Sequence, residues 1–268
     1  MDQYRKELET GFFDVIIFDN ASSDNTVDII KEKIKNLKNV CIIPNKENLG
    51  FSKGNNLAVD KSKSEYVVFL NSDTEVLDQG LVRMVEFLDQ NKKVGILGGK
   101  LKNPDGTSQK SAGVFYNLPN IFLMLVGLER FGFLRCSPGK VAQVDWVSGA
   151  CLMIGRDLFN QLNGFNEKLF MYFEDMDICF KAKLKGFTTY FYPLTNILHK
   201  ERGSSNRAFA IQNIYKGISY FYKEHKPYWQ YLILIFLLKL KAAVLILVGV
   251  ILNKEYLRKT YVDALKAI

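Results

Sequence analysis

Short apolar runs alternate with segments of helical periodicity through the first two thirds of the chain. In the segment 24–37, for example, Val27, Ile30 and Ile34 recur at the spacing of one helix face. The apolar runs are rich in β-branched residues and end in polar turns, which is typical of buried strands. We expect strands at 13–18, 40–43, Tyr66–Leu70 and 94–98, and helices at 24–37, 51–61 and Gly80–Gln90.

This alternation predicts an α/β fold with a mostly parallel sheet covered by helices on both faces. In such a sheet, ligands bind beyond the carboxyl ends of the strands. Two Asp-bearing turns follow strands here, at Asp19-Asn20 and at Asn71-Ser72-Asp73. The sequence has neither a GxGxxG turn after a strand nor a GxxxxGK[ST] loop, so a dinucleotide or P-loop site is a weak interpretation. Carboxylates that hold a divalent cation are the more obvious route to phosphate binding.

Each turn also has a plainer interpretation. Asp19-Asn20 fits an ordinary Asx turn with Asp24 as the N-cap of the next helix, and on its own we favour that interpretation. Asp73 follows an apolar strand, where a carboxylate faces the ligand crevice. Surface turns of this composition are common, so for Asp73 the two interpretations are equally supported.

The densest candidate is the run FMYFEDMD at 170–177, in which aromatic residues directly precede Glu174, Asp175 and Asp177. We expect Glu174 and Asp175 to open a helix, whose dipole stabilises a carboxylate at that end. Aromatic walls exclude water, and both conditions suit a general base. Carboxylates that only complement the dipole would account for Glu174 and Asp177, but not for the apolar run before them.

The two histidines and four cysteines indicate the function less clearly than these acidic motifs do. His199 precedes an RGSS segment and is either a metal or pyrophosphate ligand or a surface loop residue. His225 stands between charged residues, which favours a solvated face. The cysteines form no CxxC pair, which argues against a disulfide scaffold and a zinc finger and favours reduced, mostly buried thiols.

Composition and charge narrow the class of protein. With 48% hydrophobic residues the chain is expected to fold rather than to be disordered. The formal net charge of +8 by itself suggests a nucleic-acid partner. Residues 1–199 carry 24 basic and 24 acidic residues, however, whereas residues 200–268 carry 12 and 4, so the excess lies in the tail. We therefore expect no nucleic-acid partner, a catalytic domain at 1–206 and a separate C-terminal region at 207–268.

The tail contains the most apolar stretch of the chain, 231–252, interrupted by Lys239 and Lys241. Basic residues beside an apolar run favour a membrane surface. A lysine at mid-bilayer costs roughly 2.5 to 3.5 kcal/mol, so an in-plane helix or a shallow re-entrant hairpin is favoured over a simple span, with a buried C-terminal helix as the alternative. The charged opening MDQYRKELET is not a secretory signal, so we expect the protein at the cytoplasmic face of the membrane.

The chain resembles glycosyltransferase family 2, and above all its bacterial rhamnosyltransferase-like members, through motifs that occur in order along residues 10–206: DNASSD, NLGFSKGNN, VVFLNSDTEV, WVSGACLMI, GFNEKLFMYFEDMDICFKAKLKGF and LH…GSS. The resemblance implies a GT-A fold, an inverting mechanism and Mg²⁺ or Mn²⁺ as cofactor. It also implies a nucleoside-diphosphate sugar donor, dTDP-rhamnose or a UDP-sugar.

By position in those motifs, the resemblance gives each candidate a role. Asp175 takes the place of the catalytic base beside Glu174, while Asp73 and His199 take the places of metal or diphosphate ligands. The other candidates are, for the donor, Asp19, Asn20, Asn48, Gly50, Gly54, Asn55 and Asn71 and, for the acceptor, Trp146, Ser148 and Gly149.

One departure from the family concerns the start of the chain. Family members begin with an apolar strand, whereas MDQYRKELETGF resembles the helix after that strand, so the resemblance predicts a missing first strand and an open sheet edge. The leading hypothesis is a membrane-associated transferase that adds a sugar to a lipid-linked or polysaccharide acceptor, aided at the bilayer by the amphipathic stretch 115–134, for which a core helix is the alternative. The competing hypothesis is a catalytically silent, membrane-tethered binding or scaffold protein.

Overall fold

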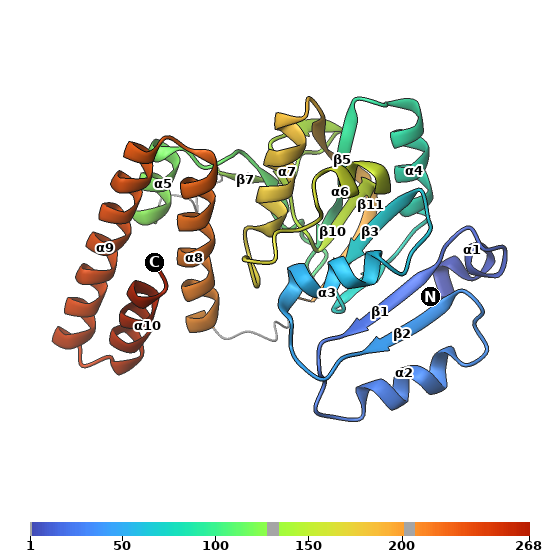
Figure 1. The fold of residues 1–268 in the computed structure, drawn as a ribbon, viewed down its shortest axis with the longest axis horizontal. Helices are drawn as coiled ribbons and strands as arrows, with labels where there is room; N and C mark the ends of the chain where they lie inside the picture. Colours follow the sequence, from blue (N-terminus) through green and yellow to red (C-terminus); the bar gives the residue numbers. More distant parts are fainter. Residues whose placement is uncertain (1, 128–133, 201–206) are drawn as a thin grey trace.

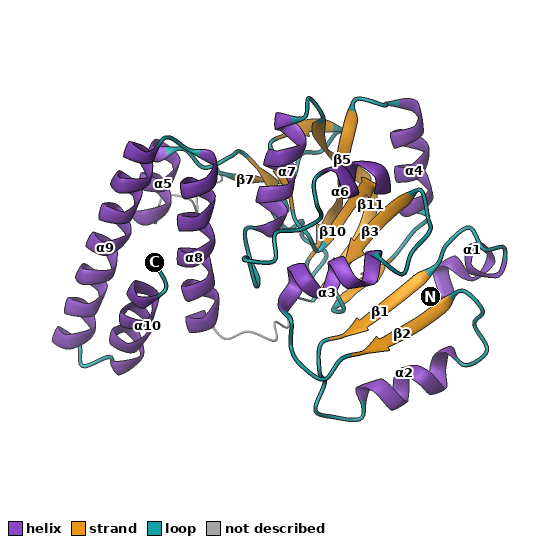
Figure 2. Cartoon of the chain, viewed as in Figure 1, coloured by secondary structure: helices purple, strands orange, loops and turns teal. Residues whose placement is uncertain are grey.

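Strands and helices alternate through the first part of the computed structural model, which describes residues 2–127, 134–200 and 207–268 (Figures 1 and 2). The strands are β1 (Val15–Asp19), β2 (Val40–Pro44), β3 (Tyr66–Leu70), β4 (Thr74–Val76), β5 (Val94–Lys102), β6 (Ala112–Gly113), β7 (Arg135–Cys136), β8 (Ala142–Val144), β9 (Trp146–Val147), β10 (Cys151–Gly155) and β11 (Thr188–His199). The helices are the 3-10 helix η1 (Asp2–Tyr4) and α1 (Arg5–Glu9), α2 (Thr26–Ile34), α3 (Gly50–Val59), α4 (Gly80–Gln90), α5 (Leu118–Leu125), α6 (Arg156–Gln161), α7 (Glu174–Leu184), α8 (Arg207–His225), α9 (Tyr228–Ile251) and α10 (Glu255–Lys266). Every strand and helix predicted from the apolar pattern is present, with ends that shift by a few residues.

The central sheet is mixed, with the strand order β3-β10-β5-β11-β4 and β8 paired to β11. β5 and β11 are parallel, whereas β10 runs antiparallel to both of its neighbours, β3 and β5. The predicted strands β3 and β5 therefore share one direction but are separated by a strand from much later in the chain. The predicted α/β class is confirmed, and the insertion of β10 makes the sheet less parallel than expected.

Alternate side chains of the central strands enter two cores, one on each face of the sheet. In β10, Leu152 and Ile154 pack on the side of α6 and α7, whereas Met153 packs on the side of α4. Met84 of α4 and Ile178 of α7 are both fully buried. Helices thus cover both faces, as the sequence predicts.

β1 and β2 form a separate two-stranded parallel sheet. Within the described residues, β1 pairs with β2 alone and β3 with β10 alone, so each keeps one unpaired edge. Both strands line a single cavity with a volume of about 2430 Å³. The open edge that the resemblance predicts is therefore a feature of this structure, and it borders the cavity.

The helices α5, α8, α9 and α10 form a helical lobe beside the mixed sheet (Figure 1). Its buried side chains, among them Phe221 and Leu238, belong to the same core as those of α7. α9 is one unbroken helix of 24 residues, so the stretch 231–252 does not form a re-entrant hairpin. Of the described helices, α9 alone is long and apolar enough to cross a membrane.

Two predicted features lie partly or wholly outside the described residues. The boundary at residue 206 and the RGSS segment fall within 201–206, and the end of the amphipathic stretch 115–134 falls within 128–133. The described part of that stretch contains α5, in which Ile121 is buried and Phe122 is exposed. The division into domains at 206/207 stays a prediction.

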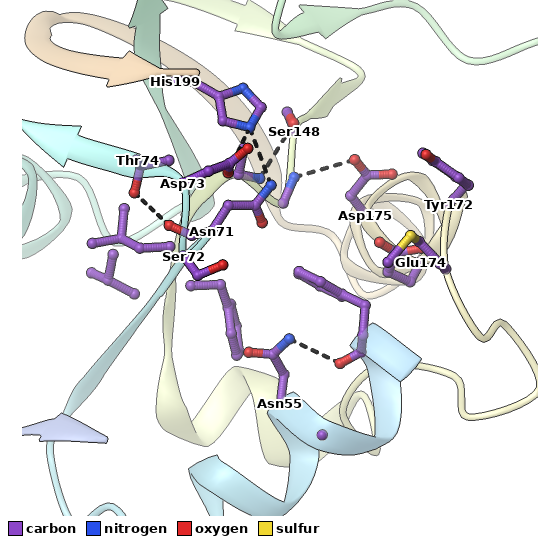
Figure 3. Close-up of a pocket in the computed structure, with 18 of the residues that line it drawn as sticks. Asn55, Asn71, Ser72, Asp73, Thr74, Ser148, Tyr172, Glu174, Asp175 and His199 are labelled. Carbon is purple, nitrogen blue, oxygen red and sulfur yellow. Dashed lines mark hydrogen bonds and ion pairs between the residues drawn. The ribbon is translucent and has the colours of Figure 1, made fainter. Parts of the chain in front are cut away.

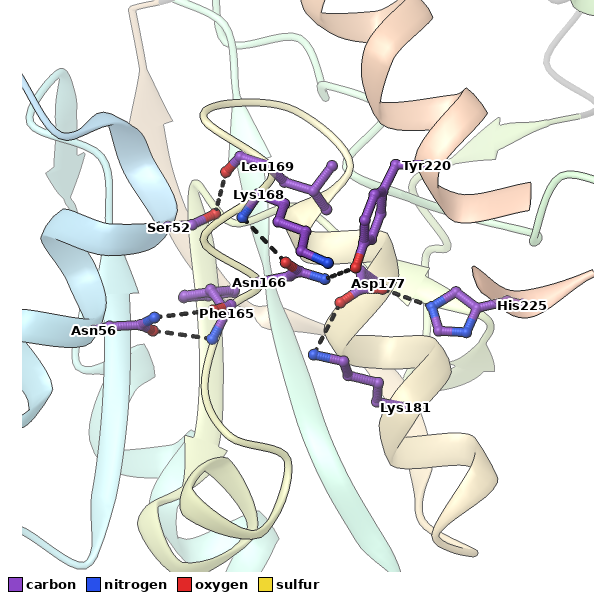
Figure 4. Close-up of polar contacts among 10 residues, drawn as sticks. All are labelled: Ser52, Asn56, Phe165, Asn166, Lys168, Leu169, Asp177, Lys181, Tyr220 and His225. Carbon is purple, nitrogen blue, oxygen red and sulfur yellow. Dashed lines mark hydrogen bonds and ion pairs between the residues drawn. The ribbon is translucent and has the colours of Figure 1, made fainter. Parts of the chain in front are cut away.

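The loop before α7 is tied to α3 on one side and to α8 on the other (Figure 4). The Ser52 hydroxyl donates to the carbonyl of Leu169 at 2.6 Å, and Asn56 makes further bonds to the same loop. The Asn166 amide donates to the Tyr220 hydroxyl at 2.7 Å. These bonds fix the segment that leads into the Glu174-Asp175 pair.

His225 is not on a solvated face, which corrects the sequence prediction. Its Nε2 lies 2.6 Å from Asp177 Oδ1, and the histidine side chain is only 11% exposed (Figure 4). Lys181 Nζ lies 3.1 Å from the other oxygen of the buried Asp177 carboxylate. Neighbouring charges in the sequence suggested solvent, but the helical face that carries His225 packs against α7. The pair therefore joins the helical lobe to the sheet.

We expect His225→Ala to lower the free energy of unfolding by about 2 kcal/mol, because the buried Asp177 carboxylate loses a hydrogen-bond partner. Urea denaturation followed by circular dichroism measures the change. Lys223→Ala, at an exposed position on the same helix, is the control and should cost less than about 0.5 kcal/mol. Equal losses in the two variants would contradict the role given to His225.

Candidate active site

Every candidate site residue named from the sequence lines the same cavity, at the carboxyl ends of β1 and β3. The candidates come from α3, the β3–β4 turn, the segment before β10, the start of α7 and the end of β11. The cavity therefore brings together residues that are more than a hundred positions apart in the chain, such as Asp73 and Asp175. Figure 3 shows the part that contains the carboxylates and His199.

Asp73 and His199 form one side of the site. Asp73 Oδ1 lies 3.2 Å from His199 Nε2, and Asn71 Nδ2 lies 3.3 Å from the same nitrogen (Figure 3). On the far side of the ring, His199 Nδ1 lies 2.9 Å from Gln109 Oε1. An amide oxygen can only accept, so this contact places a ring proton on Nδ1, while Nε2 faces the Asp73 carboxylate and the Asn71 amide.

This donor set suits a divalent cation that is shared with a substrate. The described residues contain no group of three or more Asp, Glu, His or Cys side chains that could hold a metal alone. Mg²⁺ and Mn²⁺ sites on phosphate substrates commonly use one or two protein ligands and take the rest from water and phosphate. Asp73 supplies a carboxylate, and His199 supplies an imidazole whose other nitrogen is held by an amide, as in many metal sites. The two residues therefore fit the implied cofactor.

Asp175 forms the other side of the site, at the start of α7. Its Oδ2 accepts a hydrogen bond from the Gly149 N–H at 3.2 Å, and its Oδ1 accepts one from the Met176 N–H at 2.8 Å. Burial raises the pKa of the Asp175 carboxyl, while these two N–H groups and the charge of Arg135 oppose the rise. The result is an oriented carboxylate whose pKa is raised, which is the state that a general base requires.

The turn before β10 connects the two sides of the site. The Gly149 N–H reaches Asp175, and the next carbonyl, of Ala150, accepts from the Asn71 N–H at 3.3 Å. A Cβ on Gly149 would stand 3.1 Å from the ring of Phe51. The turn therefore needs a small residue at this position to hold the base and the β3–β4 turn in one geometry.

Glu174 differs from its neighbour although the two are adjacent in sequence. It is 6% exposed, and its Oε2 has no hydrogen-bond partner among the described residues. Burial raises the pKa of Glu174 well above its usual range, and the nearby Asp175 and Asp177 carboxylates raise it further. Burial and the neighbouring carboxylates thus favour the neutral form of Glu174, whereas two backbone N–H groups favour the charged form of Asp175.

We expect Glu174→Gln to stabilise the protein at neutral and alkaline pH. The folded state holds a proton on Glu174 that the unfolded chain releases, so the wild-type protein loses stability as pH rises from the ordinary Glu value, about 4.3, toward the higher folded pKa. Gln cannot ionise, so its thermal midpoint should change less with pH over this window. Melting curves of both proteins from about pH 5 to about pH 8 test this. Glu224→Gln, at an exposed glutamate of α8, is the control and should follow the wild-type pH dependence.

Two consecutive non-glycine residues with positive φ precede α7. Tyr172 has φ +69° and Phe173 has φ +73°, a conformation that bulky residues rarely adopt. Phe173 packs on α8, where a Cβ on Gly217 would approach its side chain to 2.9 Å. The aromatic run before the acidic pair therefore has a structural function, since its packing against the helical lobe holds the strained backbone at the start of α7.

The residues predicted to bind the donor nucleotide build a tight turn beside the cavity. Asp19 accepts from the N–H and the hydroxyl of Ser22, as the plain Asx-turn interpretation predicts. Asn20 donates to the carbonyl of Gly50 at 3.0 Å and accepts from the N–H of Leu49 at 3.0 Å. Gly50 has φ +76°, and a Cβ there would stand 2.4 Å from the carbonyl of Phe170, so only glycine fits.

The other donor candidates serve the same turn and the helix after it. Asn48 Oδ1 accepts from the Gly50 N–H at 3.0 Å, and Asn55 Nδ2 donates to the Phe51 carbonyl at 2.8 Å. Gly54 lets α3 approach β1, since a Cβ there would stand 3.1 Å from the ring of Phe18. These residues give the cavity wall its shape, and their contact with a nucleotide stays a prediction.

The acceptor candidates lie beside Asp175, with different degrees of access. Trp146 is buried, and its indole N–H donates to the Val114 carbonyl at 3.1 Å. Ser148 is partly exposed, and its Oγ accepts from the Ala150 N–H at 3.3 Å. Ser148 therefore offers more surface to a ligand than Trp146 and Gly149, which are both buried.

The sequence interpretation missed two residues that act on the candidates. Gln109 is buried, its Oε1 lies beside the His199 ring and its amide donates to the His199 carbonyl at 2.9 Å. Arg135 adds positive charge near Asp175. Gln109 lies in an irregular polar segment and Arg135 in the two-residue strand β7, and no sequence pattern singled them out.

Comparisons with known proteins point to one family. The model of the family described as Glycosyl transferase family 2 matches residues 3–162. An uncharacterized protein of Sinorhizobium fredii, y4gI, is 30% identical over 200 residues, which cover 72% of this chain but only 22% of that protein. The N-acetylglucosaminyl-diphospho-decaprenol L-rhamnosyltransferase of Mycobacterium tuberculosis is 25% identical over 215 residues, which cover 72% of this chain and 68% of the relative. Among solved structures, GalNAc-T7 with UDP, GalNAc and Mn²⁺ superposes with a TM-score of 0.57 at 15% identity, covering 78% of this chain and 43% of that one.

Proposed function

The chain belongs to glycosyl transferase family 2 and has a GT-A fold, and we propose that it transfers a sugar, with inversion, from a nucleoside-diphosphate sugar to a lipid-linked acceptor. The single observation that carries the proposal is the turn at 148–150, which joins the Asp175 carboxylate to the Asp73–His199 pair within one cavity. An inverting transfer needs these two chemistries side by side. One group must take a proton from the acceptor hydroxyl, and another must stabilise the leaving diphosphate.

In this mechanism Asp175 accepts the proton of the acceptor hydroxyl as that oxygen attacks the anomeric carbon. The N–H groups of Gly149 and Met176 hold the carboxylate in place, so no reorientation is needed during the reaction. Because burial raises its pKa, Asp175 is a stronger base than an exposed aspartate. Glu174, whose surroundings favour the neutral form, can hydrogen-bond to the acceptor through Oε2, which has no partner among the described residues.

Asp73 and His199 would hold the cofactor on the donor side of the cavity. A divalent cation bound there would neutralise charge that develops on the leaving diphosphate. Asn71 sits within reach of the same histidine nitrogen and helps to orient the ring. Gln109 fixes the other nitrogen, so the imidazole presents one defined face to the site.

The relatives favour particular substrates without fixing them. The mycobacterial relative is named for an L-rhamnosyl transfer to N-acetylglucosaminyl-diphospho-decaprenol. We propose by analogy dTDP-rhamnose as the donor, a UDP-sugar as the next choice, and a lipid-diphosphate glycan as the acceptor in cell-surface glycan assembly.

The outer face of α9 supports a position on the membrane surface. Buried residues such as Leu234 and Leu238 face the helical lobe, whereas apolar residues on the opposite side are between 40% and 70% exposed. The exposed apolar residues are Trp229, Leu232, Ile233, Phe236, Leu240, Val244, Leu247, Val250 and Ile251. A helix with one face in the protein and an apolar face outward suits the plane of the interface. We propose that residues 207–268 bind the cytoplasmic surface of the membrane through this face, while 1–206 form the catalytic domain.

We expect Phe236→Glu to weaken binding to vesicles of phosphatidylglycerol and phosphatidylcholine by roughly tenfold, because a charge replaces an exposed aromatic ring that would enter the membrane interface. Cosedimentation with the vesicles measures the bound fraction. Ile29→Glu places the same charge on an exposed apolar position of α2 and should bind as the wild type does. Equal weakening by both substitutions would show that α9 is not the contact.

The function is tested by incubating the purified chain with a panel of nucleotide sugars and Mn²⁺ and measuring release of nucleoside diphosphate. Release with one or more donors supports a transferase, and proton NMR of the first-formed anomer tests for inversion. A catalytically silent binding protein would release no diphosphate from any donor, although it would still bind vesicles.

A further inference from the structure

The cavity of the candidate active site extends past Asp175 into the helical lobe. There it is bordered by α8, which lies between α7 and α9 (Figure 1). The α8 residues in this wall include Arg207, Ile211, Ile214 and Ile218. They recur every three or four positions, so they form one face of the helix. At 1.5 Å per residue this face is about 17 Å long, with a cation at one end and apolar side chains along the rest.

A second cation and two tyrosines line the same end of the cavity. Lys241 of α9, Tyr215 of α8 and Tyr261 of α10 all contribute to the wall. The two tyrosine rings lie 6.2 Å apart, edge to face. Burial raises the pKa of Tyr261 while the charge of Arg207 opposes the rise, which places that guanidinium close to the tyrosine pair. Three helices of the lobe thus bring hydroxyls and positive charges to the wall of this cavity.

The hydroxyl of Tyr215 needs a partner that the described chain does not supply. Tyr215 is 5% exposed, and its oxygen is buried with no hydrogen-bond partner in the described part of the protein. Burial raises the pKa of Tyr215, so the hydroxyl keeps its proton and can donate. Buried polar groups are nearly always hydrogen-bonded. The Tyr215 hydroxyl lines a cavity that also has cationic residues in its wall, so it can donate to an anionic ligand bound there.

We propose that this end of the cavity binds the diphosphate of a prenyl-diphosphate acceptor, with Arg207, Lys241 and Tyr215 around the diphosphate. The apolar face of α8 and Leu238 of α9 would then contact the first isoprene units. This inference rests on the proposed transferase function and names the acceptor class of the same site. It assigns the tail lysine Lys241, which the sequence alone suggested for a membrane surface, to the acceptor diphosphate.

The arrangement also fits the geometry of the reaction. Asp175 lines the same cavity, so an acceptor held by its diphosphate at the helical lobe would have its sugar on the side of the base. The outward face of α9, on the other side of the helix from Leu238, is apolar and exposed, so the rest of a long lipid chain would have a bilayer beside it. A soluble sugar phosphate would use the cations but not the apolar wall.

The test measures binding of farnesyl diphosphate to the full chain by isothermal titration calorimetry. Inorganic pyrophosphate and farnesol are the comparison ligands, and UDP reports on the donor side. We expect farnesyl diphosphate to bind at least about tenfold more tightly than either pyrophosphate or farnesol, because only it offers both the charge and the chain. Lys241→Gln and Tyr215→Phe should each weaken it by about tenfold while leaving UDP binding unchanged.

Lys239→Gln is the matched control, since Lys239 is exposed and lies two residues from Lys241 on the same helix. It should bind farnesyl diphosphate as the wild type does. Tyr215→Phe removes one oxygen only, so it keeps the test decisive if the lysine variant does not fold. The inference is overturned if pyrophosphate binds as tightly as farnesyl diphosphate, if Lys239→Gln weakens binding as much as Lys241→Gln, or if the variants lose UDP binding instead.

Failure of this inference can be told apart from failure of the proposed function. A chain that releases nucleoside diphosphate from a nucleotide sugar but does not bind farnesyl diphosphate is a transferase with another acceptor. A chain that binds farnesyl diphosphate but has no donor hydrolysis keeps the lipid site and loses the transferase.

Discussion

Asp175→Asn is expected to lower kcat by roughly 10²- to 10⁴-fold while the affinity for the donor stays within about threefold of the wild type. Asn is the same size and its single oxygen can keep one of the two backbone hydrogen bonds, from Gly149 or from Met176, but it cannot take up a proton. The loss therefore reports the base function rather than a change of shape. Steady-state kinetics with the donor identified by the panel measures kcat, and calorimetry with UDP or dTDP measures donor affinity.

The control for this variant is Asp157→Asn, which alters another aspartate in the first turn of a helix, α6, at an exposed position. It should keep wild-type kcat, because it lies outside the cavity lining. The pH profile adds a second readout. Because the pKa of Asp175 is raised, wild-type activity should fall with decreasing pH at a higher pH than an ordinary aspartate would give. Near-normal turnover of Asp175→Asn would remove Asp175 from the role of base.

The elements of the catalytic domain could be predicted because each leaves a local trace in the sequence. The run at Tyr66–Leu70 is apolar and β-branched and is bounded by polar turns, and Gly80–Gln90 repeats apolar residues at helical spacing. The pairing of the strands leaves no such trace. β10 is as apolar as its neighbours, so nothing local indicates that it separates β3 from β5.

The site could be predicted where several motifs occurred in order, and not where a residue acts through a partner that is distant in sequence. Asp73, Asp175 and His199 stand in motifs, and the structure places all three on one cavity. Gln109 acts only through its contact with His199, ninety positions away. Tyr215 lies on a helix whose apolar spacing predicts ordinary core packing. Only its buried hydroxyl, which has no partner in the described residues, indicates a binding function.

The different environments of the Glu174 and Asp175 carboxyl groups could not be predicted from the sequence either. Both are acidic residues at the start of a helix, and the sequence treats them alike. They differ because Asp175 accepts two backbone N–H bonds, whereas one oxygen of Glu174 is buried without a partner in the described residues. Hydrogen bonds to the ionised form favour it and burial disfavours it, so two adjacent carboxyl groups meet different conditions for ionisation.

Asp73→Asn is the second substitution with a large expected effect. In the wild type, Mn²⁺ should increase the affinity for UDP or dTDP by roughly 10- to 100-fold, because Asp73 would hold a cation that neutralises charge on the diphosphate. The variant keeps the size of the side chain but loses the charge that a hard cation requires. Its affinity for the nucleotide should therefore be the same with and without Mn²⁺, as measured by calorimetry with and without a chelator.

Asp60→Asn is the control, at an exposed aspartate after α3, and it should keep the full response to Mn²⁺. His199→Gln separates the two ligands further. If His199 binds the cation through Nε2, this variant should lose part of the response, whereas a histidine that only hydrogen-bonds to Asp73 would leave it intact, since Gln can still donate to the carboxylate. A normal Mn²⁺ response in Asp73→Asn would show that the cation binds elsewhere. Asp73 would then serve only to orient His199. The charge of the leaving diphosphate would need another partner in the cavity.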